Sequence, residues 1–167
     1  MNVFTLFTVN RKGKTEMEKP KRINYFKAVF PAKSINESYA RSLAANFAAQ
    51  ADPTIEELSD IKTVISEAVT NCIVHAYINE EDEKKKKIVL EGERYSDESF
   101  RFSVKDFGCG IPDINKAKEP LFTTSPETER SGMGFCIMET FTDKMRVYSK
   151  VGKGTKVVVT KRFASGS

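Results

Sequence analysis

The stretch VKDFGCG at residues 104–110 places an aspartate and two glycines, in the spacing D-x-G-x-G, at the end of a predicted strand. The strand is ESFRFSVKDFG, residues 98–108, and it delivers Asp106 at its exit. An aspartate there can accept a hydrogen bond from an exocyclic amine, and glycines let the backbone approach a flat base. A glycine-rich turn with a turn-forming aspartate fits the same letters. The neighbouring segments have to distinguish a base-binding site from a simple glycine-rich turn.

The letters DFG also occur in protein kinases, where the aspartate binds magnesium. That fold needs a Gly-rich loop, a strand lysine and an HRD loop earlier in the chain. The one histidine is His75 and Ala76 follows it, so there is no HRD loop. At 167 residues the chain is about one domain, too short for the two kinase lobes. The protein-kinase fold is therefore excluded, and the P-loop and G-x-G-x-x-G motifs are absent as well.

The composition is that of an ordinary globular protein, with 40% hydrophobic and 30% charged residues. Its 27 basic and 23 acidic residues are largely intermixed, so the net charge of +4 does not predict a nucleic-acid partner. The three cysteines are widely spaced and accompanied by one histidine. This argues against a zinc site or a disulfide framework and favours reduced thiols in the cytoplasm. No run approaches the roughly 18 apolar residues that span a bilayer, so we expect no membrane segment.

The chain divides by composition into a tail, one domain and a short end. Residues 1–22 carry structure-breaking residues and mixed charge, and Met17 is an alternative start. We expect the domain at residues 23–163 and a C-terminal tail at residues 164–167.

Periodicity predicts the order of strands and helices in that domain. A capping box of Ser34 and Glu37 is expected to begin the first helix. This order predicts an α+β fold, a two-layer sandwich with helices on one face of a mostly antiparallel sheet. The loop before the third helix is long enough to be functional. The expected elements are a strand at 23–32, helices at 34–50 and 54–78, strands at 87–95 and 98–108, the loop, a helix from about 133 and a hairpin at 145–163.

Two further motifs flank the D-x-G-x-G stretch. In EAVTNCIVHAY, Glu67 and Asn71 are four residues apart and share one helical face beside the apolar stripe. An amide oxygen suits magnesium, and a nearby carboxylate can orient or deprotonate a hydroxyl; an isolated pair also fits a solvated helix edge. RSGMGF, residues 130–135, opens a helix whose exposed N–H groups suit phosphate, and a plain Gly-rich cap fits equally well.

The three motifs become specific through their joint order. In this order the chain resembles the GHKL (Bergerat-type) ATPases, the group of gyrase, Hsp90, histidine kinases and MutL. Glu67 and Asn71 match its N box, "DFGCG" its G1 box and "GMGF" its G2 box.

A closer similarity links the chain to the anti-sigma factors of spore-forming bacteria that act on a sigma-F type factor. Residues 36–77 and 120–141 carry this similarity. The whole resemblance covers roughly residues 23–162, nearly all of the chain apart from the N-terminal tail.

The resemblance implies a site for ATP and Mg²⁺. In it Asp106 would read adenine, Asn71 would hold magnesium and Glu67 would be the base facing a substrate serine. The loop 119–131 would be the ATP lid, and Arg130 at its end would reach the terminal phosphate. The other implied ATP-binding positions are Gly108, Gly110, Thr123, Thr124, Ser131, Gly132, Met133, Gly134, Phe135 and Thr155.

The resemblance also implies protein partners. These are a sigma factor of the sigma-F type, a small anti-anti-sigma protein that is phosphorylated on serine, and a second copy of the chain in a homodimer. Arg41 in the first helix matches the position expected to contact the sigma factor, although an ordinary exposed helical arginine fits it too.

Three alternatives remain open. A general-stress anti-sigma kinase shares the chemistry, but the complete D-x-G-x-G and the sequence PLFTT favour the sporulation type. A histidine-kinase catalytic domain would need a phospho-acceptor histidine upstream, and the segment before residue 23 contains none. A module that binds nucleotide and sequesters its partner without transfer is the third, and the presence of both Glu67 and Asn71 argues against it.

Overall fold

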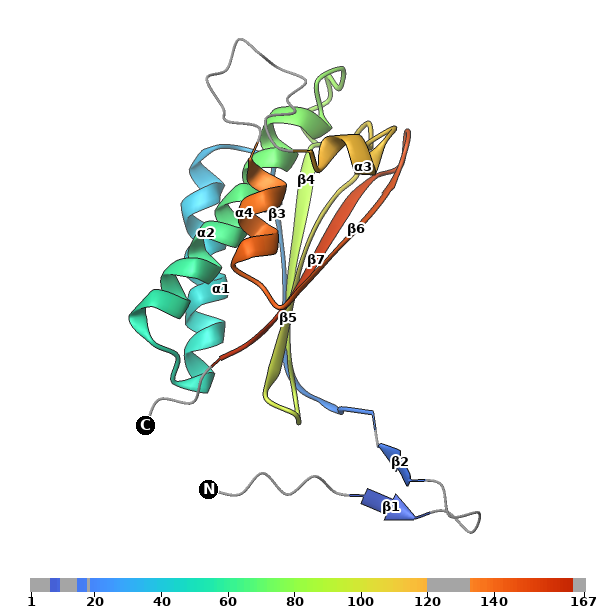
Figure 1. Ribbon diagram of the computed structural model, residues 1–167. Helices are drawn as coiled ribbons and strands as arrows, with labels where there is room; N and C mark the ends of the chain where they lie inside the picture. Colours follow the sequence, from blue (N-terminus) through green and yellow to red (C-terminus); the bar gives the residue numbers. More distant parts are fainter. Residues whose placement is uncertain (1–6, 10–14, 18, 120–132, 164–167) are drawn as a thin grey trace.

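The computed structural model describes residues 7–9, 15–17, 19–119 and 133–163. A five-stranded sheet runs through it in the order β3-β4-β5-β7-β6, and each neighbouring pair is antiparallel. Figure 1 shows these strands as one twisted layer. Their bounds are β3 (Arg22–Pro31), β4 (Lys87–Tyr95), β5 (Ser99–Asp106), β6 (Lys144–Lys150) and β7 (Gly154–Arg162).

Helices lie on one face of this sheet (Figure 1): α1 (Ile35–Ala48), α2 (Ile55–Asn71) and α4 (Gly134–Thr140). The central helix α2 packs against both α1 and α4. The predicted α+β fold, a helical layer on an antiparallel sheet, is confirmed. The predicted apolar stripe of the long helix is also buried, and it comprises Ile61, Ile65, Ala68, Cys72 and Ala76.

Aromatic side chains fill the core between α1 and the sheet. The Phe47 ring of α1 meets the rings of Phe100 and Phe102 on β5 edge-on, with centroid distances of 5.8 and 6.2 Å. Phe26 of β3 packs against Phe47 at 4.9 Å, and it does so over Gly92 of β4, where a Cβ atom would overlap the Phe26 ring. Edge-to-face pairs of this kind add stabilisation beyond the apolar area that they bury.

The predicted capping box at Ser34 is wrong, and the one that exists begins α2. Ser34 has helical backbone angles (φ −56°, ψ −33°) and its side chain makes no capping hydrogen bond. Thr54 is extended (φ −65°, ψ 162°), and its hydroxyl accepts from the N–H of Glu57 while the Glu57 carboxylate accepts from the Thr54 N–H. Glu37 instead accepts a hydrogen bond from Ser66 on α2.

Other predicted bounds hold to within a few residues, with three additions. Regular helix ends at Asn71, and one π-helical turn, η2 (Cys72–Ala76), completes the segment predicted as helix to residue 78. A short helix, α3 (Ile114–Ala117), begins inside the predicted loop. In the predicted N-terminal tail, β1 (Phe7–Val9) pairs antiparallel with β2 (Thr15–Met17).

The two cap positions give a matched test. Thr54→Ala removes an acceptor for the first turn of α2 and should lower the free energy of unfolding by about 1 kcal/mol. Ser34→Ala should change it little, because that hydroxyl caps nothing. Urea unfolding followed by circular dichroism measures both variants, and equal losses would contradict the assignment.

Candidate functional site

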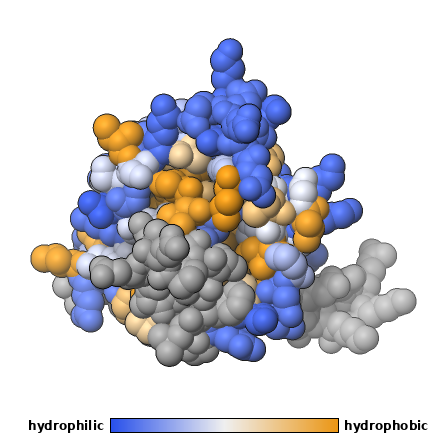
Figure 2. All heavy atoms as spheres, turned by 90° about the horizontal axis from the view of Figure 1, so that it is seen from above, coloured by the Kyte–Doolittle hydropathy of each residue, from blue (hydrophilic) through white to orange (hydrophobic). Residues whose placement is uncertain are grey.

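A cavity of about 950 Å³ opens at the end of the molecule where β5 stops. Seen from above in Figure 2, apolar side chains gather at this end within a rim of hydrophilic ones. Its walls come from α2, η2, the segment after β5, α3, the start of α4 and the β6–β7 turn. The lining includes Glu67, Asn71, Cys72, His75, Ile78, Asp106, Cys109, Gly110, Ile111, Met133, Gly134, Phe135, Val151 and Thr155.

Asp106 is the buried carboxylate of this cavity, with 3% of its surface exposed. Its Oδ1 atom accepts hydrogen bonds from the N–H groups of Gly108 (2.9 Å) and Thr155 (3.1 Å), and its Oδ2 atom accepts one from the Cys72 thiol (3.6 Å). Burial raises the pKa of Asp106, and these three hydrogen bonds offset part of that rise. Burial also raises the pKa of Cys72, so the thiol keeps its proton and acts as a donor at neutral pH.

The structure explains why residue 108 of the D-x-G-x-G motif is a glycine. A Cβ atom on Gly108 would overlap the carbonyl oxygen of Ala76, at the end of η2. That same oxygen accepts a hydrogen bond of 2.7 Å from the Cys109 N–H. The sequence predicts glycine here so that the backbone can approach a base. What Gly108 approaches is the end of the helix, and Gly110 rather than Gly108 lines the cavity.

Tyr77 ties the helix end to the strand exit, and nothing in the sequence patterns pointed to it. Its buried hydroxyl donates to the Lys87 carbonyl and accepts from the N–H groups of Lys87 (3.2 Å) and Phe107 (3.0 Å). Phe107 directly follows Asp106, so one phenol links η2, the start of β4 and the loop after β5. In the sequence Tyr77 is the second-last residue of the predicted helix, and no pattern there distinguishes it from a packed helical tyrosine.

Glu67 and Asn71 of α2 both line the cavity, near the start of α4. They face the start of α4, since a Cβ atom on Gly134 would lie 2.9 Å from Oε2 of Glu67 and 3.4 Å from Nδ2 of Asn71. Gly134 therefore lets α4 approach α2 at the point where these two polar side chains stand. The contact brings Glu67 and Asn71 together with the GMGF segment.

The remaining predicted residues fall into three groups. Met133, Phe135 and Thr155 line the cavity. Arg41 lies away from it on α1, half-exposed, 3.4 Å from the Glu37 carboxylate. The predicted residues that lie outside the described part of the chain are Thr123, Thr124, Arg130, Ser131 and Gly132, together with most of the predicted lid.

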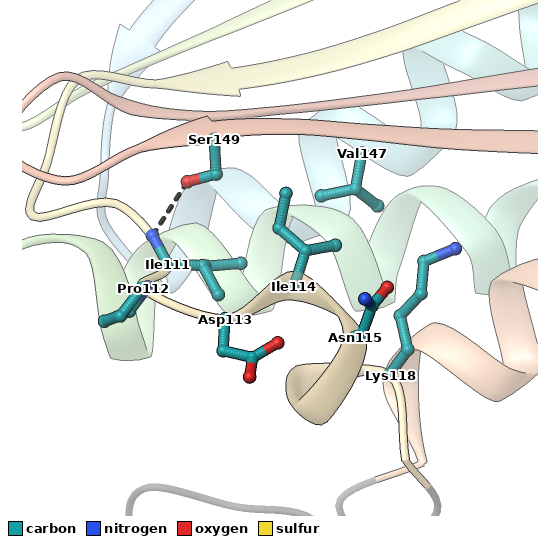
Figure 3. A pocket seen from close by; sticks show the side chains of 8 residues that line it. All are labelled: Ile111, Pro112, Asp113, Ile114, Asn115, Lys118, Val147 and Ser149. Carbon is teal, nitrogen blue, oxygen red and sulfur yellow. Dashed lines mark hydrogen bonds between the residues drawn. The ribbon is translucent and has the colours of Figure 1, made fainter.

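A second hollow of about 560 Å³ shares the wall formed by residues 111–113. Figure 3 shows it between α3 and β6, with Ile114 and Val147 turned toward one another. The Ser149 hydroxyl at its edge accepts from the Ile111 N–H (2.7 Å) and bonds the Thr155 hydroxyl (2.8 Å). Because Thr155 in turn bonds Asp106, this chain of contacts fixes the outer wall of the main cavity.

Within the described residues, no group of three or more His, Cys, Asp or Glu side chains could hold a metal ion by itself. A single protein oxygen, such as that of Asn71, can still hold magnesium when a substrate phosphate supplies the other ligands. None of the helices in the described segments is long and apolar enough to cross a membrane.

A family model described as a histidine kinase-like ATPase domain matches residues 30–161. The chain belongs to this ATPase family. An Anti-sigma F factor from Clostridium perfringens is 50% identical over 140 residues, which cover 84% of this chain and 97% of that relative. Another, from Geobacillus kaustophilus, is 53% identical over 135 residues, covering 81% of this chain and 90% of the relative. The predicted family resemblance is thereby confirmed.

Solved structures share the fold. The RsbU and RsbW domains of a Mycobacterium tuberculosis protein match with a TM-score of 0.61 at 20% identity, covering 84% of this chain and 32% of that one. The SiaB-SiaC complex from Pseudomonas aeruginosa matches with a TM-score of 0.61 at 11% identity, covering 83% and 89%.

The cavity fits what membership of this ATPase family implies, ATP binding with Mg²⁺. Its volume lies in the range of small-molecule sites, which is roughly 300–1,000 Å³. Its lining holds a buried acceptor, Asp106, suited to an amine donor, together with the amide of Asn71 and the carboxylate of Glu67.

The Tyr77 phenol can be tested directly. Tyr77→Phe leaves buried groups of Lys87 and Phe107 without their partner, so the free energy of unfolding should fall by about 1–3 kcal/mol. Tyr148→Phe is the control, because Tyr148 is 53% exposed on β6. Denaturant unfolding of both variants decides the matter, and a Tyr77→Phe protein as stable as the Tyr148→Phe protein would refute the role.

Proposed function

We propose that the chain is an anti-sigma factor that binds a sigma factor of the sigma-F type and uses Mg-ATP to phosphorylate a small anti-anti-sigma protein on serine. The observation that carries the proposal is one cavity with Asp106 at its buried end and Glu67 and Asn71 opposite α4. The names of the relatives that are about half identical over most of the chain support the choice of partners.

In this proposal each cavity residue has a separate task. Asp106 accepts a hydrogen bond from the exocyclic amine of adenine. The side-chain oxygen of Asn71 holds magnesium, which offsets charge on the phosphates. The serine oxygen of the substrate attacks the terminal phosphorus, its proton passes to Glu67, and ADP leaves. Arg130 and the lid residues Thr123 and Thr124 complete the site in the same proposal.

The partners follow from the same family assignment. Arg41 on α1 is half-exposed and has only the Glu37 carboxylate as a described ion-pair partner, so a partner protein can reach it. We infer contact with the sigma factor there, a homodimer as the functional form, and action in the cytoplasm, where transcription takes place. The unit that does this is residues 23–163, with residues 1–22 and 164–167 as tails.

The two other functions considered from the sequence remain alternatives to the full proposal. A general-stress type anti-sigma kinase would use the same cavity with a different sigma factor. A sequestering module would bind nucleotide and partner without transfer. Measured phosphotransfer would exclude the sequestering module. The identity of the sigma factor that binds would distinguish the general-stress kinase from the sigma-F type.

The base assignment predicts a split between binding and transfer. Glu67→Gln keeps the shape of the side chain and removes its proton acceptor, so phosphotransfer should fall by about 100-fold or more. The dissociation constant for ADP should stay near the wild-type value, because Glu67 does not contact the base. Glu56→Gln, an exposed change on the same helix, is the control. Transfer at the wild-type rate by Glu67→Gln would exclude Glu67 as the base.

The chemical class of the product tests the serine-kinase proposal. Radiolabelled ATP with magnesium should label the wild-type anti-anti-sigma protein and not its serine-to-alanine variant, and the label should survive acid. Acid-labile label would indicate phosphohistidine and a histidine-kinase function. Absence of label from a protein that binds ATP would support the sequestering module.

A further inference from the structure

The thiol of Cys72 touches the carboxylate at the buried end of the cavity. Cys72 is the first residue of η2, is 6% exposed and lines the cavity. Its Sγ atom lies 3.6 Å from Oδ2 of Asp106. The proposed function gives this thiol no task, although it is the one side chain among the described residues that donates to Asp106.

The Cys72 thiol limits how many acceptor positions of Asp106 are open to a ligand. A carboxylate offers about four acceptor positions, two on each oxygen. Both positions of Oδ1 are filled, by the N–H groups of Gly108 and Thr155. The thiol fills one position of Oδ2. Within the described part of the chain, one acceptor position of Asp106 therefore remains for a ligand.

We propose that Cys72 is a positioning residue that sets base specificity. By filling one side of Oδ2, it leaves a single acceptor position that takes one N–H donor, such as the amine of a 6-aminopurine. This inference rests on the proposed role of Asp106 as the reader of the base.

The discrimination against a 6-oxopurine follows from the same count. The O6 atom of a 6-oxopurine is an acceptor and would face Oδ2 of Asp106, which is also an acceptor. Neither oxygen would then have a donor, so the affinity for the 6-oxopurine is lower. A water placed beside Oδ2 would relieve this cost by donating to both oxygens. The Cys72 sulfur, 3.6 Å from Oδ2, excludes a water from the position that it fills.

Replacing the thiol should therefore strengthen IDP binding relative to ADP binding. ADP and IDP differ at position 6 of the purine and in the N1 proton that accompanies the 6-oxo group. In Cys72→Ala, the ratio of the IDP to the ADP dissociation constant should fall by about fivefold, because water can enter beside Oδ2. Cys136→Ala is the control, since the Cys136 thiol contacts the Lys118 carbonyl and lies outside the cavity lining. Calorimetric titration with Mg²⁺ present measures the ADP and IDP dissociation constants of the wild-type protein and of both variants.

A second variant distinguishes hydrogen donation from bulk. The Cys72→Ser hydroxyl can fill the same acceptor position, so this variant should keep a ratio within about twofold of the wild-type value. An unchanged ratio in Cys72→Ala, with both nucleotides weakened alike, would overturn the inference and leave Cys72 a packing residue. Equal falls in the serine and alanine variants would also overturn it. Failure of the wild-type protein to bind ADP would instead sink the proposed function.

Discussion

The carboxylate of Asp106 is the constraint on which the site depends. Its Oδ1 atom receives the N–H of Gly108 from the loop after β5 and the N–H of Thr155 from the start of β7. Two neighbouring strands and a loop therefore meet at one buried oxygen. A buried carboxylate is costly unless its acceptor positions are filled. One acceptor position of Asp106 remains open to the cavity among the described residues, and a polar ligand group can be recognised there.

The surroundings hold this carboxylate in place from the helical side. The loop after β5 is pressed against the end of η2, where Gly108 and the Cys109 N–H both approach the carbonyl of Ala76. Tyr77 closes the same junction through the N–H of Phe107. A π-helical turn redirects the chain at the point where the helix reaches the cavity, and such turns are frequent at functional sites. The site is thus built where regular elements end, and backbone contacts, rather than long side chains, set its shape.

Much of this arrangement could be predicted from the sequence. Alternation and helical periodicity predicted the strands and the buried stripe of α2, because both patterns follow directly from which side chains face the core. The spacing of Glu67 and Asn71 correctly placed them on one face, and the D-x-G-x-G stretch correctly placed Asp106 at a strand exit.

The features that the sequence did not predict depend on contacts between segments that are distant in the chain. The letters S-x-x-E at Ser34 and T-x-x-E at Thr54 are equivalent as patterns, and only the entry angle of the chain decides which one forms a cap. The π-turn and the bonds of Tyr77 arise because β4 and the loop after β5 converge on η2. The close approach of Gly108 to Ala76 could not be predicted for the same reason, since the two residues are 32 positions apart in sequence.

Binding of Mg-ADP by wild-type protein and by Asp106→Asn is the most direct test of a nucleotide site organised by this carboxylate. The asparagine oxygen can keep the bonds to Gly108 and Thr155, while its NH₂ group would turn a donor toward the thiol and the base. We expect the wild-type protein to bind ADP, Asp106→Asn to bind it about tenfold or more weakly, and the unfolding midpoint to change little. Equal ADP affinity in the two proteins would contradict it.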